Sequence, residues 1–126
     1  MALGKRTKSG GTYYEGFSLT VNASTGAYVK DMTLTNRNAA INSVIVVPLS
    51  FGSGDSFKLE HLDAGDATKR TLATNIPNVG ASAAWSFDFP ALEEIGIDEP
   101  LRLTYTNAAG VAMKVWIVVE YAGKRE

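Results

Sequence analysis

The chain has 126 residues, 12 basic and 13 acidic side chains, a formal net charge of −1 and no cysteine. This length predicts one folded domain, and the near-neutral charge gives no overall reason to expect nucleic acid or an anionic membrane as a partner. The lack of cysteine excludes disulfides, thiolate metal sites and a cysteine nucleophile. No apolar run is long enough for a membrane span or a secretion signal, so we expect a protein made in the cytoplasm.

The first eleven residues differ in composition from the rest of the chain. They contain Lys5, Arg6 and Lys8, three glycines and no acidic residue. Such a segment predicts a flexible basic arm that can meet an acidic partner. We therefore divide the chain into an arm, residues 1–11, and a single β-sandwich domain, residues 12–126.

Most of the remaining sequence alternates between apolar and polar residues, which is the pattern of half-buried antiparallel strands. It is clearest in residues 101–107 and 111–121, which flank a turn and predict a hairpin. The stretch 44–49 is apolar on both faces, which predicts a central strand covered on both sides, and Pro48 predicts a bend or strand end there. The predicted strands, in chain order, are residues 13–22, 28–36, 44–49, 57–61, 68–76, 83–89, 101–107 and 111–121.

About eight short strands with turn signals every 8–14 residues predict an all-β, antiparallel β-sandwich of jelly-roll type. An immunoglobulin-like sandwich is the alternative. At most one short helix is expected, at residues 90–97, because proline suits the first position of a helix. The residues expected in the core are Leu103, Tyr105, Val115, Ile117 and Val119, with Trp85 and Phe87.

No group of residues predicts catalysis, so we expect no enzymatic activity and no cofactor. His61 is the only histidine, and it is expected to be a structural residue of its strand, since no nucleophile motif surrounds it. Asp55, Asp63 and Asp66 lie in glycine-rich loops, where calcium ligands can occur. Aspartate is also an ordinary turn residue, and the acid density is too low for a calcium loop, so no metal site is predicted.

One acidic cluster stands out in the sequence. Paired carboxylates can hydrolyse glycosides when they face each other across a cleft, but residues this close in sequence do not ensure that geometry. We expect a solvated face or an electrostatic contact to a basic partner. The cluster consists of Glu93, Glu94, Asp98 and Glu99.

The candidate interface is aromatic. Trp116 and Val118 fall on the face of their strand opposite the predicted core residues, next to charged residues. A large aromatic residue in such surroundings is typical of an interface centre. Tyr13 and Tyr14, which follow the arm, are further candidates.

The arm, the short loops rich in Ala, Asn, Thr and Gly, and the strong last strand together resemble the small capsid decoration (cement) proteins of tailed phages. The resemblance implies a homo-oligomer, and among oligomeric states it favours a trimer. It further implies binding to the major capsid protein or another virion protein on the capsid surface, without nucleic acid or membrane. The alternative is a carbohydrate-binding or lectin-like β-sandwich, with Trp116, Tyr13, Tyr14 and Tyr28 as its aromatic platform.

Overall fold

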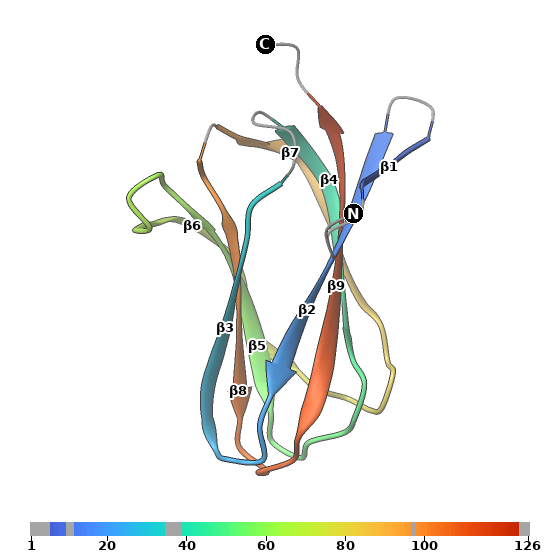
Figure 1. Ribbon diagram of the computed structural model, residues 1–126, viewed down its shortest axis with the longest axis vertical. Coiled ribbons are helices and arrows are strands. Elements are labelled where there is room, and N and C mark those ends of the chain that lie inside the picture. The colour runs from blue at the N-terminus through green and yellow to red at the C-terminus, as the bar shows by residue number, and fades with distance from the viewer. Residues whose placement is uncertain (1–5, 10–11, 35–38, 97, 124–126) are drawn as a thin grey trace.

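The structure is a computed structural model that describes residues 6–9, 12–34, 39–96 and 98–123, and it is an antiparallel β-sandwich (Figure 1). The described residues form nine strands and no helix, which confirms the all-β prediction. No helix of that part of the chain has the length and apolar character needed to cross a membrane. In chain order the strands are β1 (Arg6–Ser9), β2 (Thr12–Val21), β3 (Gly26–Met32), β4 (Ala39–Pro48), β5 (Ser56–Leu62), β6 (Thr68–Pro77), β7 (Trp85–Ile95), β8 (Leu101–Asn107) and β9 (Met113–Gly123).

The strands form two sheets, here called the first and the second. The first has the order β1-β2-β9-β4-β7 and the second the order β3-β8-β5-β6. The pairings are nested, because β2 pairs with β9, β3 with β8, β4 with β7 and β5 with β6. Folding one long antiparallel hairpin into two facing sheets gives this order, which is that of a jelly roll. The jelly-roll prediction is therefore confirmed, and the immunoglobulin-like alternative is wrong.

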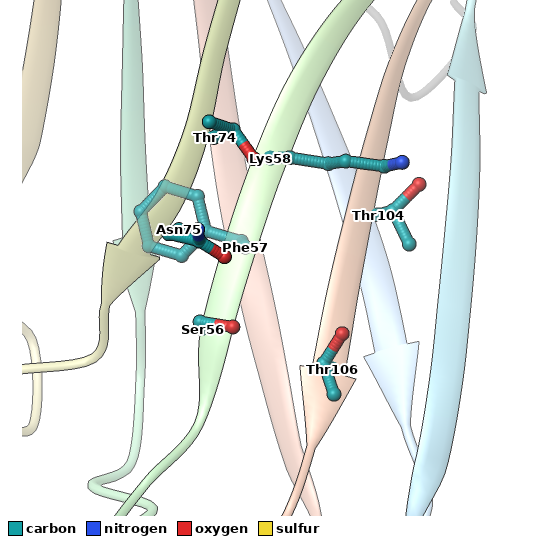
Figure 2. Close-up of a pocket in the computed structure, with 7 residues that line it drawn as sticks. All are labelled: Ser56, Phe57, Lys58, Thr74, Asn75, Thr104 and Thr106. Carbon is teal, nitrogen blue, oxygen red and sulfur yellow. The ribbon is translucent and has the colours of Figure 1, made fainter.

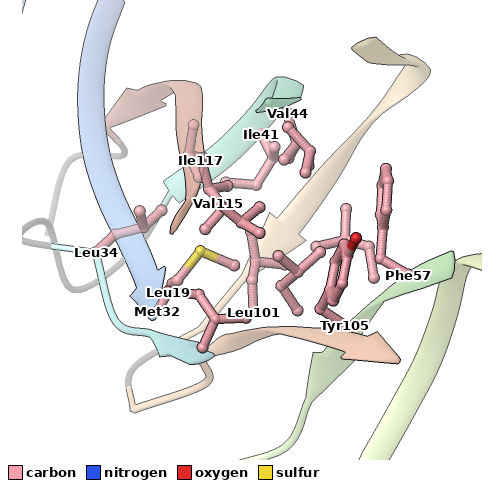
Figure 3. Close-up of a cluster of buried hydrophobic side chains, with 14 of the residues drawn as sticks. Leu19, Met32, Leu34, Ile41, Val44, Phe57, Leu101, Tyr105, Val115 and Ile117 are labelled. Carbon is pink, nitrogen blue, oxygen red and sulfur yellow. The ribbon is translucent and has the colours of Figure 1, made fainter. Parts of the chain in front are cut away.

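The core lies between the two sheets, and its residues come from alternate positions of their strands (Figure 3). The five predicted core residues on β8 and β9 are fully buried, which confirms the predicted register. Trp85 and Phe87 are only half-buried, although Trp85 packs against the core cluster. Their exposure follows from their place on β7, an edge strand with a neighbour on one side only.

The predicted helical turn at residues 90–97 is wrong, because β7 continues to Ile95. Its pairing with β4 jumps from Asp88 opposite Ser43 to Glu93 opposite Ile41, so four residues of β7 stand against one of β4. An irregular edge strand of this kind can hold a proline, which cannot donate to a sheet ladder. Pro48 is the last residue of β4, at the strand end that the sequence predicted.

Part of the predicted arm belongs to the sandwich. Residues 6–9 form β1, which pairs with β2 in the register Arg6–Glu15 to Ser9–Thr12. This strand was not predicted, since four residues without a hydrophobic alternation give no strand signal. Lys5 lies outside the described residues.

Candidate functional site

The candidate site is the outer face of the first sheet, which points away from the core. Alternate residues of β9 face the core, so the residues between them must face outward. These outward residues are Lys114, Trp116, Val118 and Glu120, and β9 is the central strand of the sheet.

Apolar residues of β4 stand beside the middle two of these positions. Val47 is the register partner of Trp116, and Ile45 is the register partner of Val118. Trp116 is 47% exposed, and the other three are half-buried. We call these four residues, Trp116, Val118, Ile45 and Val47, the outer patch.

A shallow hollow borders the outer patch on the β2 side. Gly16 is the β2 partner of Val118, between Tyr14 and Ser18 along the outward side of β2. A Cβ atom built on Gly16 would meet nothing nearer than the Ile117 carbonyl oxygen, at 4.0 Å. Glycine therefore leaves open space beside Val118 that a larger side chain could fill without disturbing the sheet.

Polar residues close the outer patch at both ends. At one end the carboxylate of Glu120 accepts hydrogen bonds from Ser43 Oγ (2.9 Å) and Tyr14 Oη (3.4 Å). Tyr14 is itself 39% exposed. At the other end Lys114 is exposed. The outward face thus has an apolar centre between an acidic and a basic end.

The outer face of the second sheet differs from this arrangement. Apart from the exposed Val29 of β3, its residues are mostly polar or charged, and Arg102 donates two hydrogen bonds, of 2.6 and 2.9 Å, to the carboxylate of Asp31. That hydrogen bonding from Arg102 lowers the pKa of Asp31 from its usual value. A polar depression of about 60 Å³ also opens on this face (Figure 2), lined by Ser56, Phe57, Lys58, Thr74, Asn75, Thr104 and Thr106. This face is typical of a sheet surface left to water, whereas the outer patch is not.

The structure separates the predicted interface residues into two groups. Trp116, Val118 and Tyr14 share the outer face of the first sheet. Tyr13 instead packs against the core, with its ring 5.6 Å from that of Tyr121. Tyr28 also packs against the core, so two of the four aromatic residues of the predicted sugar platform face inward.

Ile45 and Val47 are interface candidates that the sequence pattern alone does not single out. Their stretch is apolar on both faces, which predicted burial of both faces within the chain. β4 is indeed central, but it pairs with neighbours only in its own sheet, and the second sheet covers one face. The two-sided apolar pattern was the available signal, because a strand of an antiparallel sandwich needs only one apolar face.

His61 joins the two sheets through a buried ionic cluster. Its Nδ1 lies 2.8 Å from Glu93 Oε2, and its Nε2 lies 2.9 Å from Glu99 Oε1. A neutral imidazole has one N–H, so only the protonated ring donates to both carboxylates at once. Lys69 and Arg70 of β6 contact the same two carboxylates from the solvent side.

This cluster corrects the expectation of a solvated acidic face. Glu93 is buried and Glu99 largely so, whereas Glu94 and Asp98 are exposed. His61 is buried between its two carboxylate partners, which agrees with the structural role predicted for it.

The pKa of Glu99 predicts acid sensitivity. Burial alone raises this pKa, but hydrogen bonds from the Gly96 N–H, Lys69 and His61 outweigh burial and hold the pKa at about 2 instead of 4.5. A folded-state pKa below the unfolded value contributes stability above pH 4.5 that is lost as the pH falls toward 2. We expect Glu99→Gln to lower the free energy of unfolding at neutral pH and to reduce its decline over that acid range, as measured by urea denaturation.

The exposed Asp98 provides the control for this prediction. Asp98→Asn keeps a residue suited to the positive φ of 63° at that position and is expected to leave the acid dependence unchanged. Equal declines in wild type and Glu99→Gln would contradict the assignment.

Two of the three aspartates considered as calcium ligands, Asp55 and Asp63, have structural partners for their carboxylates. Asp55 is buried and accepts hydrogen bonds from the Tyr105 hydroxyl (2.7 Å) and from the backbone N–H groups of Ala108 and Ala109 (2.7 and 2.9 Å). Asp63 accepts the N–H groups of its own turn, from Gly65 and Ala67. Within residues 6–9, 12–34, 39–96 and 98–123, no group of three or more potential metal ligands occurs.

Comparisons with known proteins leave the family of this chain open. No protein-family model matches the sequence, and no curated protein matches it. Among solved structures, the chain is similar to the cyanophage Pam1 capsid asymmetric unit, at 18% identity and a TM-score of 0.49, over 96% of this chain and 92% of the other. It is also similar to a Bacillus endospore appendage structure, at 12% identity and a TM-score of 0.43, over 98% and 96%.

A third similar structure is a mutant of a family 29 carbohydrate-binding module complexed with cellulohexaose, at 13% identity and a TM-score of 0.38, over 94% and 75%. Particles of infectious bursal disease virus and of the extra small virus of Macrobrachium rosenbergii are also among the similar structures. Viral capsid proteins thus recur among them, beside a pilus and a sugar-binding module. At these TM-scores, function has to be inferred from the residues of this chain.

Proposed function

We propose that this chain is a structural protein of a virion that binds the outer surface of a phage capsid as a homo-oligomer and stabilises it. The observation that carries the proposal is the outer patch: an exposed tryptophan beside three aliphatic residues at the centre of one sheet, while the opposite sheet presents mostly polar and charged residues to water, with Val29 as an isolated apolar one. The phage setting comes from the resemblance to decoration proteins that the sequence shows.

The outer patch supports a protein contact for an energetic reason. Each Å² of apolar surface removed from water contributes about 25 cal/mol. A tryptophan with aliphatic residues beside it is typical of an energetically dominant interface centre. Extended sugar platforms need several exposed aromatic rings in a row. Tyr14 and Trp116 are the pair that share this face, and their rows are four residue positions apart on β2, about 13 Å along the strand.

The basic residues Lys5, Arg6 and Lys8 supply the attachment to the capsid in this proposal. Three positive charges without an acid between them suit an acidic groove of the major capsid protein. A capsid offers many identical sites to one oligomer, which raises the effective concentration, so each contact can be weak. Replacing all three by alanine keeps the β1 backbone and is expected to weaken cosedimentation with capsids.

The outer patch can be tested through the oligomeric state. We expect Trp116→Asp to shift the protein toward monomer in native mass spectrometry and analytical ultracentrifugation, because a charge at the centre of an apolar contact must be desolvated on association. The melting temperature should hardly change, since the side chain faces solvent in the isolated subunit.

Val29 provides a matched control on the second sheet. It is 50% exposed, close to the value for Trp116, and Val29→Asp is expected to leave the oligomer intact. A wild type that is monomeric at high concentration would refute the proposed oligomer. Binding to an oligosaccharide array that is lost in Trp116→Ala would support the carbohydrate-binding alternative instead.

A further inference from the structure

The outward residues of β9 have complementary chemistry when their order is reversed. The order is Lys114, Trp116, Val118 and Glu120, with the inward Ile117 at its midpoint. When a second copy of the strand is laid on the first in the opposite direction and centred on Ile117, Lys114 faces Glu120. Trp116 then faces the smaller Val118. An isologous contact between two copies needs this kind of self-complementarity.

The two neighbouring strands share the same midpoint. On β4, Val47 and Ile45 lie in the rows of Trp116 and Val118. The same reversal therefore places Val47 of one copy against Ile45 of the other. On β2, Ser18 and Gly16 lie in those same rows. The hollow at Gly16 then lies beside the Val118 position that receives the tryptophan ring of the other copy.

We infer that the outer patch packs on the outer patch of a second copy across a two-fold axis. The axis lies in the plane between the two facing sheets and crosses β9 at a right angle at the level of Ile117. Trp116 of one copy packs on Val118 of the other, and Lys114 of one copy pairs with Glu120 of the other, twice over. This inference rests on the proposed oligomer-forming role of the patch and specifies its partner. The axis gives a dimer, in contrast to the trimer that the resemblance to decoration proteins implies.

The footprint sets the expected strength of the contact. Six residue steps along β9 span about 20 Å, and the three strands β2, β9 and β4 span about 14 Å, so each copy contributes a flat area on the order of 300 Å². The two copies together then bury less than the roughly 1,000 Å² expected of a stable specific interface, so the contact is a weak one. We therefore expect a dimer that dissociates on dilution, in the micromolar range or above, and that weakens with added salt because its charge pairs lie at the rim.

Exchanging the two charges tests the two-fold axis. In Lys114→Glu the two acidic ends would face each other, and in Glu120→Lys the two basic ends would do so, so each variant alone is expected to be monomeric. In a mixture, glutamate at position 114 of one variant faces lysine at position 120 of the other. At the opposite end, the unchanged Glu120 of the first variant faces the unchanged Lys114 of the second. We expect heterodimers in native mass spectrometry of the mixture, with wild-type dimer as reference.

Lys58→Glu is the control, since Lys58 lies on the outer face of the second sheet, and it is expected to dimerise like wild type. A mixture that stays monomeric would overturn the two-fold axis. A wild-type trimer would also overturn it but leave the proposed function standing. A wild type that stays monomeric up to about 1 mM would overturn both, because even weak specific interfaces form at that concentration.

Glu120→Lys loses the hydrogen bonds from Ser43 and Tyr14, so a second measurement guards against misfolding. The chain has no cysteine, which gives a clean background for crosslinking. Facing sheets lie about 10 Å apart, so a thiol crosslinker of that length is expected to join Gly16→Cys to Ser18→Cys in a mixture. Crosslinking of each variant with itself to the same extent as in the mixture would overturn the register.

Discussion

Val115→Asp is expected to lower the free energy of unfolding by at least about 4 kcal/mol, which is a large part of the roughly 5 to 15 kcal/mol that keeps a domain folded. Val115 is fully buried at the centre of the core, between β2 and β4. A carboxylate there has no cation to pair with among the aliphatic neighbours, and a buried unpaired charge is among the most destabilising changes known for single residues. Circular dichroism during urea denaturation measures the loss.

The adjacent residue gives a stringent control. Trp116 is one position further along the same strand and faces outward, so Trp116→Asp introduces the same charge into solvent. We expect Trp116→Asp to unfold at nearly the wild-type urea concentration. Similar losses in both variants would contradict the register of β9 and, with it, the identification of the outer patch.

The register of β9 is also the best example of what the sequence can predict. A period of two over eleven residues specifies which side is apolar, and a slip of one residue would turn every core side chain to solvent. The weaker strands were predicted for the same reason, although less sharply. β1 could not be predicted, because its stability comes from backbone pairing with β2, which leaves no mark in the side-chain pattern.

The strand order depends on contacts that a single sequence does not encode locally. Nested pairing joins β2 to β9 across about 100 residues, and no local sequence pattern predicts which strands pair. The jelly-roll type could be inferred only from the number and spacing of strands. The pairing itself then explains why the outer patch collects residues from both halves of the chain.

The polar clusters were missed for a related reason. The sequence presents Glu93 and Glu99 as part of an acidic surface run, because their cationic partners lie on strands of the other sheet. Asp55 looks like an ordinary turn residue, because its partner Tyr105 lies 50 positions further along the chain. Burial of a charged group becomes visible only when the partner that satisfies it is placed beside it.

Asp55 ties together three loops at one end of the sandwich. Its Oδ2 accepts the Tyr105 hydroxyl, which in turn accepts Nδ2 of Asn78 at 2.8 Å. Its Oδ1 accepts two backbone N–H groups of the β8–β9 turn. The carboxylate lies so close to Gly52 that a Cβ atom there would overlap it, at 2.0 Å from Oδ2. Burial and the hydrogen bond to Asp55 raise the pKa of Tyr105, so this hydroxyl stays a donor.

Asp55→Ala is therefore expected to lower the free energy of unfolding by about 3 to 5 kcal/mol, because the buried Tyr105 hydroxyl and two part-buried backbone N–H groups lose their acceptor at once. Asp63→Ala is the matched control. Asp63 also accepts two backbone N–H groups, but in an exposed turn where water replaces the carboxylate, so we expect a loss of about 1 kcal/mol or less. Urea midpoints at constant slope measure both changes. Equal losses would show that the Asp55 network holds its loops no more firmly than a solvent-exposed turn.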